Sequence, residues 1–395
     1  MSELNASNLR KEQGKEGPDL VGVTELTSPY FMVPPSGTTE QRPHNPEPGT
    51  LRFNTDSGGL EYFRGDGLGW EFIEKVNPNL GGGTGSNTGS GTRALFGGGF
   101  DVGSQPASDN TVNYLTIPTL GDAQDFGDLA TGVRQSGQGQ MSSRTRGMVM
   151  GGSTASGLIN TIQYATMAST GNFSDFGDCV SANKERLGFS NQVRCMQAAG
   201  ELPSTNQDIE YITIASNGQN ASDFGANMGR ECTKGVGIAS PTRGLFIGGK
   251  LSSTTYNTID YVTIMTTGDA IDFGDLTVAR TQGAAIGNAT RAVVAGGIKA
   301  SQDVTYNTID YVTIATTGNA TDFGDMTTAM GAVGGMASSP TRGVWGGGYA
   351  VPTPTATNAM EYITLSTLGN SADFGDLTVA MYYYGISCSS GHGGL

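Results

Sequence analysis

Residues 307–325 read NTIDYVTIATTGNATDFGD, and this stretch decides the fold class. Its first half alternates as a β-strand does: the odd-numbered Ile309, Tyr311 and Thr313 point to one side and residues 310, 312 and 314 to the other. Both sides carry apolar groups, so the strand is predicted to be covered on both faces by neighbouring sheets. The second half, NATDFGD, is interpreted as the next strand of the same sheet.

The stretch belongs to a repeat of about fifty residues. Its Asp-Phe-Gly triplet occurs six times, with successive spacings of 50, 48, 49, 50 and 51 residues. Two further markers keep the same period and order, an arginine that opens an apolar run and a tyrosine in the following strand. The triplets begin at Asp125, Asp175, Asp223, Asp272, Asp322 and Asp373; the arginines are Arg93, Arg146, Arg194, Arg243, Arg291 and Arg342; the tyrosines are Tyr114, Tyr164, Tyr211, Tyr261, Tyr311 and Tyr362.

Each repeat divides into four strand-length pieces. The first is rich in Gly, Ala and Ser, as in GAAIGNA at residues 283–289, which suits strands that crowd around an axis. The first repeat begins at Thr92 with a strand of the second type, and the chain closes with VAMYYYGISCSS, an extra strand of the first type. Residues near Tyr382 to Ser389 are therefore predicted to complete the sheet begun at Thr92 and to hide two open edges.

A Gly pair after an apolar strand, an aromatic in the next strand and a second aromatic before a short loop resemble the kelch repeat. The resemblance covers residues 92–395 and implies an all-β fold, a six-bladed kelch-like β-propeller. The chain departs from the usual kelch pattern in carrying phenylalanine where that repeat usually has tryptophan. These phenylalanines are predicted to be buried between blades: Phe126, Phe176, Phe224, Phe273, Phe323 and Phe374.

The first ninety residues do not repeat. We predict an extended Pro-rich arm over residues 1–48, a small three-stranded β module over 49–77 and a Gly-rich tether over 78–91. The segment GTLRFNTD at 49–56, with LEYF and Trp70 after it, resembles segments of tail-fibre and other virion appendage proteins of tailed phages. The apolar cluster of this module is predicted to comprise Leu51, Phe53, Leu60, Tyr62, Trp70 and Phe72.

Composition limits the chemistry. The net charge of −14 disfavours a nucleic-acid or anionic membrane partner, and the start of the chain has no apolar core typical of a secretory signal. We expect no enzyme, cofactor or metal site: His44 and His392 are interpreted as exposed, and the four cysteines as buried free thiols. The acids of the Asp-Phe-Gly-Asp motifs are expected to cap turns and pair with the strand-opening arginines, although paired carboxylates leave a calcium site open.

The repeats also look like those of virion structural proteins from phages of marine cyanobacteria. The resemblance implies a virion appendage, made in the host cytoplasm and oligomeric in the particle. Its arm would dock to other virion proteins, and its propeller would meet a host-surface glycan or protein, or a neighbouring virion protein. A neck, tail or capsid decoration protein without host contact, and a bacterial carbohydrate-binding or carbohydrate-processing propeller, are the alternatives. The residues proposed to dock the arm are Tyr30, Phe31, Met32 and Val33.

Overall fold

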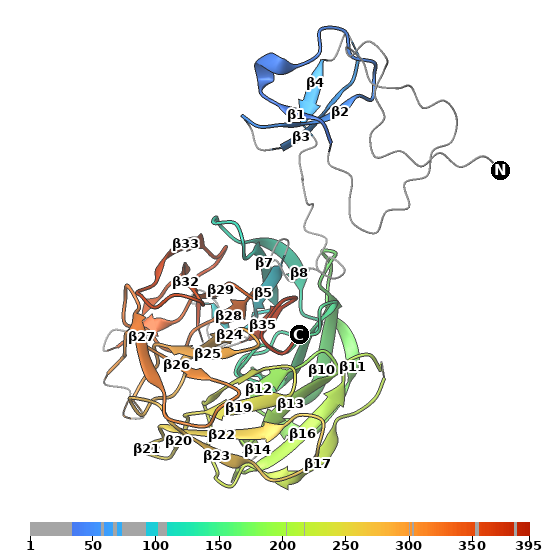
Figure 1. Ribbon diagram of the computed structural model, residues 1–395. Coiled ribbons are helices and arrows are strands. Elements are labelled where there is room, and N and C mark those ends of the chain that lie inside the picture. Colours follow the sequence, from blue (N-terminus) through green and yellow to red (C-terminus); the bar gives the residue numbers. More distant parts are fainter. Residues whose placement is uncertain are drawn as a thin grey trace, which may run out of the picture. The chain divides into compact units, whose positions relative to one another are not determined.

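The computed structural model describes residues 34–56, 59–65, 69–72, 92–101, 109–202, 204–216, 218–299, 301, 304–351, 355–382 and 385–395. The chain divides into two compact units, Met1–Val76 and Asn77–Leu395. In the described residues the only helical element is a short 3-10 turn, η1 (Thr39–Gln41), and all other regular structure is β-strand (Figure 1). The predicted all-β class is confirmed.

The N-terminal unit is built on a four-stranded sheet in the order β1-β2-β3-β4. The three predicted strands are present and antiparallel: β2 (Leu51–Asn54), β3 (Gly59–Phe63) and β4 (Trp70–Phe72). A fourth strand, β1 (Ser36–Gly37), pairs parallel with β2 and was not predicted, because it lies in the Pro-rich segment interpreted as an extended arm.

The face of this sheet that is buried is the polar one. Glu61 is fully buried and accepts hydrogen bonds from Arg42, whose Nη2 lies 2.6 Å from Oε2, and from Asn54 at 3.1 Å. Arg52 Nη1 lies 3.3 Å from the other carboxylate oxygen. Phe63 is buried on the same side.

The predicted apolar cluster of the module is therefore wrong. Leu60 is 37% exposed, and Leu51, Phe53 and Tyr62 are only half-buried on the opposite face. Trp70 is half-buried and packs on Phe63 on the polar side, while the Phe72 side chain lies outside the described residues. Alternation along a strand separates two faces but does not say which one the rest of the chain covers; here the segment that carries Arg42 covers the polar face.

The C-terminal unit contains six repeat sheets, one for each Asp-Phe-Gly triplet. Five have four antiparallel strands and the second has three. In sheet order they are β35 (Ile386–Ser389), β5 (Arg93–Gly97), β7 (Thr111–Thr116) and β8 (Gln124–Asp128); β9 (Arg146–Thr154), β10 (Gly157–Thr166) and β11 (Ser174–Asn183); β12 (Leu187–Ser190), β13 (Arg194–Ala198), β16 (Asp208–Thr213) and β17 (Ser222–Asn227); β18 (Val236–Ala239), β19 (Arg243–Ile247), β22 (Thr258–Thr263) and β23 (Ile271–Asp275); β24 (Ala284–Gly287), β25 (Arg291–Ala295), β26 (Thr308–Thr313) and β27 (Thr321–Asp325); β28 (Gly335–Ser338), β29 (Arg342–Gly346), β32 (Ala359–Thr364) and β33 (Ala372–Asp376).

Four two-stranded ribbons extend from these sheets. They pair β6 (Phe100–Asp101) with β34 (Met381–Tyr382), β14 (Glu201–Leu202) with β15 (Ser204–Thr205), β20 (Lys250–Leu251) with β21 (Thr254–Thr255), and β30 (Tyr349–Ala350) with β31 (Thr355–Ala356).

The C-terminal strand completes the first repeat sheet. β35 runs antiparallel to β5, with Ile386 opposite Gly97 and Ser389 opposite Ala94. This pairing confirms the predicted exchange of strands between the two ends of the repeat region. It covers edges of β5 and β35 that would otherwise be unpaired.

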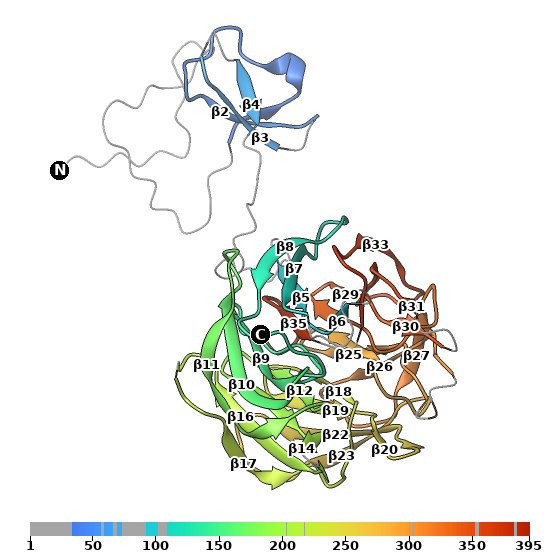
Figure 2. The same cartoon turned by 180° about the vertical axis from the view of Figure 1, so that it is seen from behind.

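Strands of the first type lie near the middle of the unit and strands of the fourth type at its periphery. Figure 1 shows β24, β28 and β35 in the middle, and Figure 2 shows β12, β18 and β35 there; in both views β11, β17, β23, β27 and β33 lie around them. The inner strands β12, β18, β24, β28 and β35 contact one another in this order. Their small side chains allow this close approach, as the composition of residues 283–289 predicts.

The second repeat departs from the pattern. Its first piece, residues 134–143, forms isolated bridges instead of a sheet strand, Gln138 parallel to Leu187 and Gly139 parallel to Gly237. At Gly139 a Cβ would stand 1.7 Å from the carbonyl oxygen of Gly188, so only glycine fits there. The segment thus lies between the inner strands of other sheets.

The strand-opening arginines link each repeat to the next. In each repeat the guanidinium stacks on the marker tyrosine, 4.2–5.2 Å from the ring centroid. Each Nη1 also donates to a main-chain carbonyl of the following repeat at 2.6–2.9 Å. The pairs are Arg93 with Met167, Arg146 with Ile214, Arg194 with Ile264, Arg243 with Ile314, Arg291 with Leu365, and Arg342 with Ile117.

The expected pairing of these arginines with the Asp-Phe-Gly-Asp acids is wrong for Arg194, Arg243, Arg291 and Arg342, whose hydrogen bonds go to carbonyls. The final aspartate of the motif is instead held through its backbone. The amide of Asp275 donates to Asn319 Oδ1 of the next repeat, 3.1 Å away, and the amide of Asp325 donates likewise to Asn370 at 3.0 Å. The motif therefore fastens a turn of one repeat to the strand of its neighbour.

Candidate functional site

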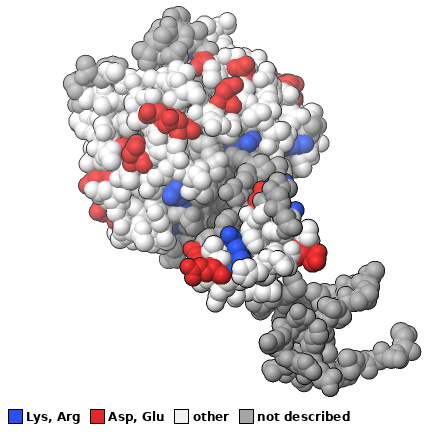
Figure 3. Space-filling view, turned by 90° about the horizontal axis from the view of Figure 1, so that it is seen from above, with Lys and Arg blue, Asp and Glu red and all other residues white. Residues whose placement is uncertain are grey.

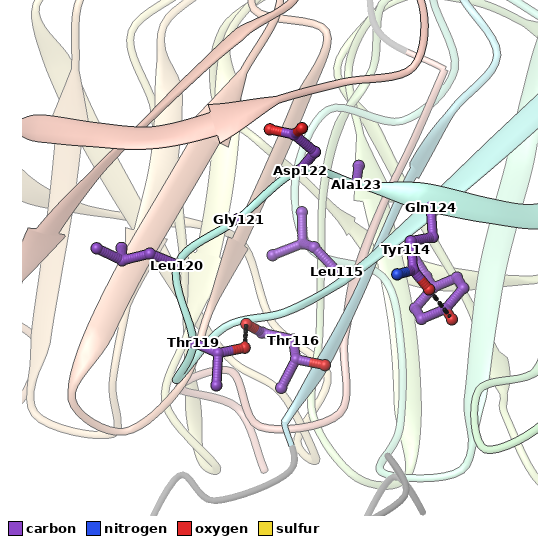
Figure 4. A pocket seen from close by; sticks show the side chains of 9 residues that line it. All are labelled: Tyr114, Leu115, Thr116, Thr119, Leu120, Gly121, Asp122, Ala123 and Gln124. Atoms are coloured by element: carbon purple, nitrogen blue, oxygen red, sulfur yellow. Dashed lines mark hydrogen bonds between the residues drawn. The ribbon is translucent and has the colours of Figure 1, made fainter.

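A pocket of about 440 Å³ lies beside the turn between β7 and β8. Figure 4 shows the Leu120 side chain pointing away from Tyr114 and Gln124, and the Tyr114 hydroxyl donates a hydrogen bond to Gln124 Oε1. Thr119 Oγ1 donates to the carbonyl of Thr116 at 3.2 Å and holds the turn. The lining residues are Tyr114, Leu115, Thr116, Thr119, Leu120, Gly121, Asp122, Ala123 and Gln124.

Exposed apolar side chains occupy the same turn in neighbouring repeats. Leu120 in the first repeat and Leu368 in the sixth are 57% and 58% exposed, each just before the glycine that ends the turn. The two repeats adjoin, because the amide of Gly121 donates to the carbonyl of Phe374 at 2.9 Å. Large exposed apolar residues at equivalent tips mark a candidate contact surface. Sequence reasoning missed them, although the TLG triplets at 119–121 and 367–369 were the available signal.

The middle of the repeat unit is filled with protein. Gln140 is buried there and bridges distant repeats: its Nε2 donates to Ser338 Oγ at 2.9 Å and to the carbonyl of Ala285 at 3.3 Å. Its Oε1 accepts from the amide of Ser338 at 2.9 Å. Gln140 of the second repeat thus links the inner strands β24 and β28 of the fifth and sixth repeats.

Five residues with a left-handed backbone conformation lie in a row just before the inner strands. Gln135, Glu185, Lys234, Gln282 and Ala332 occupy equivalent positions, all with φ between 50° and 61°. The amides of the last four each donate to the carbonyl of the preceding residue in this series, at 2.7 Å for Glu185, 3.1 Å for Lys234, 2.8 Å for Gln282 and 3.0 Å for Ala332. The backbone itself therefore joins five consecutive repeats at this end.

The C-terminal tail lies over the exit side of the inner strands. His392 is 4% exposed, so the expectation that it is an exposed tail residue is wrong, whereas His44 is exposed. The amide of Gly394 donates to His392 Nδ1 at 3.1 Å, which assigns the proton to Nε2, and Nε2 donates to the carbonyl of Ser142 at 3.0 Å. Arg144 holds the carbonyl oxygen of Leu395 at 3.0 Å.

Burial shifts the pKa of the histidine and cysteine side chains in the C-terminal unit. It lowers the pKa of His392 to about 4, so the ring is neutral at physiological pH. It raises the pKa of the thiols of Cys179, Cys195, Cys232 and Cys388, which are buried and free as predicted, so they stay protonated near neutral pH.

The phenylalanines of the Asp-Phe-Gly triplets lie deep in the repeat unit. All six are 0–3% exposed, and each of five repeats stacks its phenylalanine edge-on against its marker tyrosine at 5.8–6.1 Å. Contact with the next repeat is direct for Phe126, whose ring centroid lies 6.4 Å from that of Phe173. The proposed docking residues Tyr30, Phe31, Met32 and Val33 lie outside the described residues.

The surface carries a dispersed negative charge. Figure 3 shows acidic side chains at several separate places on the visible face, with fewer basic ones between them. None of the described helical segments is long and apolar enough to span a membrane. No protein-family model matches the chain, and a search of curated proteins found no match.

Proposed function

We propose that the six repeat sheets are the blades of a six-bladed, kelch-like β-propeller. The arginine-to-carbonyl bonds support this arrangement, because they run from each repeat to the next and from the sixth back to the first. The pairing of β35 with β5 is the strand exchange by which propellers commonly hide their edges.

We further propose that the protein is a structural appendage of a phage virion, in which the N-terminal unit joins the particle and the propeller presents a contact surface. The observation that carries the proposal is the filled axis: Gln140 and the tail at His392 occupy the place where a propeller enzyme would bind substrate. Contact is then left to the outer turns, where Leu120 and Leu368 are exposed. A position in the neck, tail or capsid without host contact is the variant of this proposal.

The pocket beside β7 and β8 favours a second candidate, a carbohydrate-binding propeller. Hydroxyl, amide and carboxylate groups of Thr119, Gln124 and Asp122 gather around it next to an apolar side chain, the mixture that sugar ligands require. Two results together would favour this candidate. The protein would bind glycans and lose this binding in Gln124→Ala and Leu120→Asp, and it would be absent from purified particles.

Incorporation into particles tests the main proposal. Residues 92–395 alone should fold but be absent from purified virions, whereas residues 1–91 fused to a reporter should be incorporated. Circular dichroism of each fragment checks folding, and an immunoblot of gradient-purified particles measures incorporation. Normal incorporation of the repeat region alone would overturn the role of the N-terminal unit, including the docking role of Tyr30, Phe31, Met32 and Val33.

A further inference from the structure

The aspartate of every Asp-Phe-Gly triplet stands opposite a polar residue of the preceding strand. In the first two repeats that residue is a neutral amide. In the other four it is a second carboxylate, and like charges directly opposite each other repel. The pairs are Asn113 with Asp125, Gln163 with Asp175, Glu210 with Asp223, Asp260 with Asp272, Asp310 with Asp322, and Glu361 with Asp373.

In three of the four pairs an arginine of the chain forms a salt bridge with the carboxylate of the preceding strand. Arg186 lies 2.9 Å from Glu210, Arg230 lies 2.8 Å from Asp260, and Arg280 lies 2.8 Å from Asp310. The three arginines come from different positions in their repeats. The structure thus places a guanidinium beside the equivalent carboxylate in three repeats, each time from a different position along the repeat.

In the sixth repeat a methionine stands where the fifth has its arginine. Met330 and Arg280 are equivalent, since their carbonyls accept hydrogen bonds from Gly297 and Gly249, the second members of the two Gly pairs. Thr327 donates hydrogen bonds from its amide and its hydroxyl to the carboxylate of Glu361, and Thr277 donates the same two bonds to Asp310.

Among the described residues, Glu361 therefore has no arginine of this kind beside it. Ser371 Oγ adds a hydrogen bond to it at 2.6 Å, but a hydroxyl does not balance the charge. Within the described part of the chain, no lysine or arginine lies within salt-bridge distance of this carboxylate.

A pocket of about 220 Å³ lies at this place. Glu361, 5% exposed, lines it together with the exposed Asp373 and with Met330. The corresponding pocket of the third repeat, of about 170 Å³, has Arg186 in its wall beside Glu210 and Asp223. The sixth repeat keeps the two carboxylates and the space, without the guanidinium.

We propose that this pocket binds a guanidinium group, supplied by an arginine side chain of a partner protein. A planar guanidinium can donate to two carboxylates at once and is more weakly hydrated than an ammonium, so it enters a partly buried pocket more readily than a lysine does. It would occupy in the sixth repeat the place that Arg280 occupies in the fifth. The proposal is independent of the virion role.

The test is a titration of the full-length protein with N-acetyl-arginine amide, followed by calorimetry or by NMR of Met330 labelled at its methyl group. We expect saturable one-to-one binding, weakened at least about tenfold in Glu361→Gln and in Met330→Arg, which supplies the guanidinium from the chain itself. Met330→Leu is the matched control and should bind as the native protein does.

Four outcomes would overturn the proposal. They are absence of saturable binding, equal binding of N-acetyl-lysine amide, unchanged binding in Met330→Arg, and displacement of the probe by millimolar Ca²⁺. Thermal melting of each variant checks that it is folded. If Glu361→Gln does not fold, the comparison of Met330→Arg with Met330→Leu decides alone, because both keep the carboxylates.

Discussion

Arg342 Nη1 donates a hydrogen bond to the carbonyl oxygen of Ile117, 2.9 Å away, although 225 residues separate them in the chain. The same bond joins Arg291 to Leu365 between consecutive repeats. The sixth repeat is therefore fastened to the first as each repeat is fastened to its successor.

Arg342→Met and Arg291→Met should destabilise the protein equally. Each removes a charge-assisted hydrogen bond and leaves a carbonyl without its donor, which costs about 1–3 kcal/mol. Urea unfolding of both variants measures the free energy of unfolding. A loss confined to Arg291→Met would mean that the contact between the sixth and first repeats is not made in solution.

Phe323→Ala should lower the free energy of unfolding by about 3–5 kcal/mol, because it opens a cavity where a ring that is 3% exposed packs against Tyr311. Leu368→Ala, at an exposed turn, is the control and should change stability by no more than about 0.5 kcal/mol. If Phe323→Ala costs less than about 1 kcal/mol, the ring is not part of the core in solution.

Acid should destabilise the C-terminal unit through His392. The pKa of this ring is about 4 in the folded protein and 6.5 in the unfolded chain, so the unfolded chain binds the proton more readily. The neutral ring therefore makes its full contribution to the free energy of unfolding above pH 6.5. This contribution is lost as the pH drops to 4, and the loss amounts to up to about 3 kcal/mol.

Urea midpoints measured between pH 4 and 7 check this dependence. His392→Gln should flatten the part of the slope that lies between pH 4 and 6.5, whereas substitution of the exposed His44 by Gln should leave it intact. An identical slope in native protein and His392→Gln would show that the tail is not seated as described.

Calcium and chelators should leave the melting temperature unchanged. The described residues contain no group of three or more His, Cys, Asp or Glu side chains arranged to hold a metal ion. The final aspartates of the Asp-Phe-Gly-Asp motifs instead use their backbone amides to bind the next repeat, as Asp275 does with Asn319. Differential scanning fluorimetry with EDTA or Ca²⁺ measures this, and a shift of several degrees would restore the paired-carboxylate site.

The strands were predicted from side-chain alternation and from the repeated period. The alternation at Ile309, Tyr311 and Thr313 identified a strand covered on both faces, and the extra strand after Ala380 identified the partner of β5. These features depend on neighbours along the chain or on a repeated period. The propeller itself remains a proposal supported by the bonds between repeats.

Long-range contacts decided the rest. The sequence by itself determined the six repeats and their sheet strands apart from the first strand of the second repeat, because backbone pairing and side-chain alternation act over a few residues. Only the tertiary structure decided that the polar face around Glu61 is buried, that His392 lies inside, and that Arg186, Arg230 and Arg280 reach equivalent carboxylates from unequal positions. A long flexible side chain can reach the same carboxylate from several positions in a fold. Its partner is therefore set by three-dimensional distance and by the energy of burying a charge. Spacing along the chain records neither of these quantities.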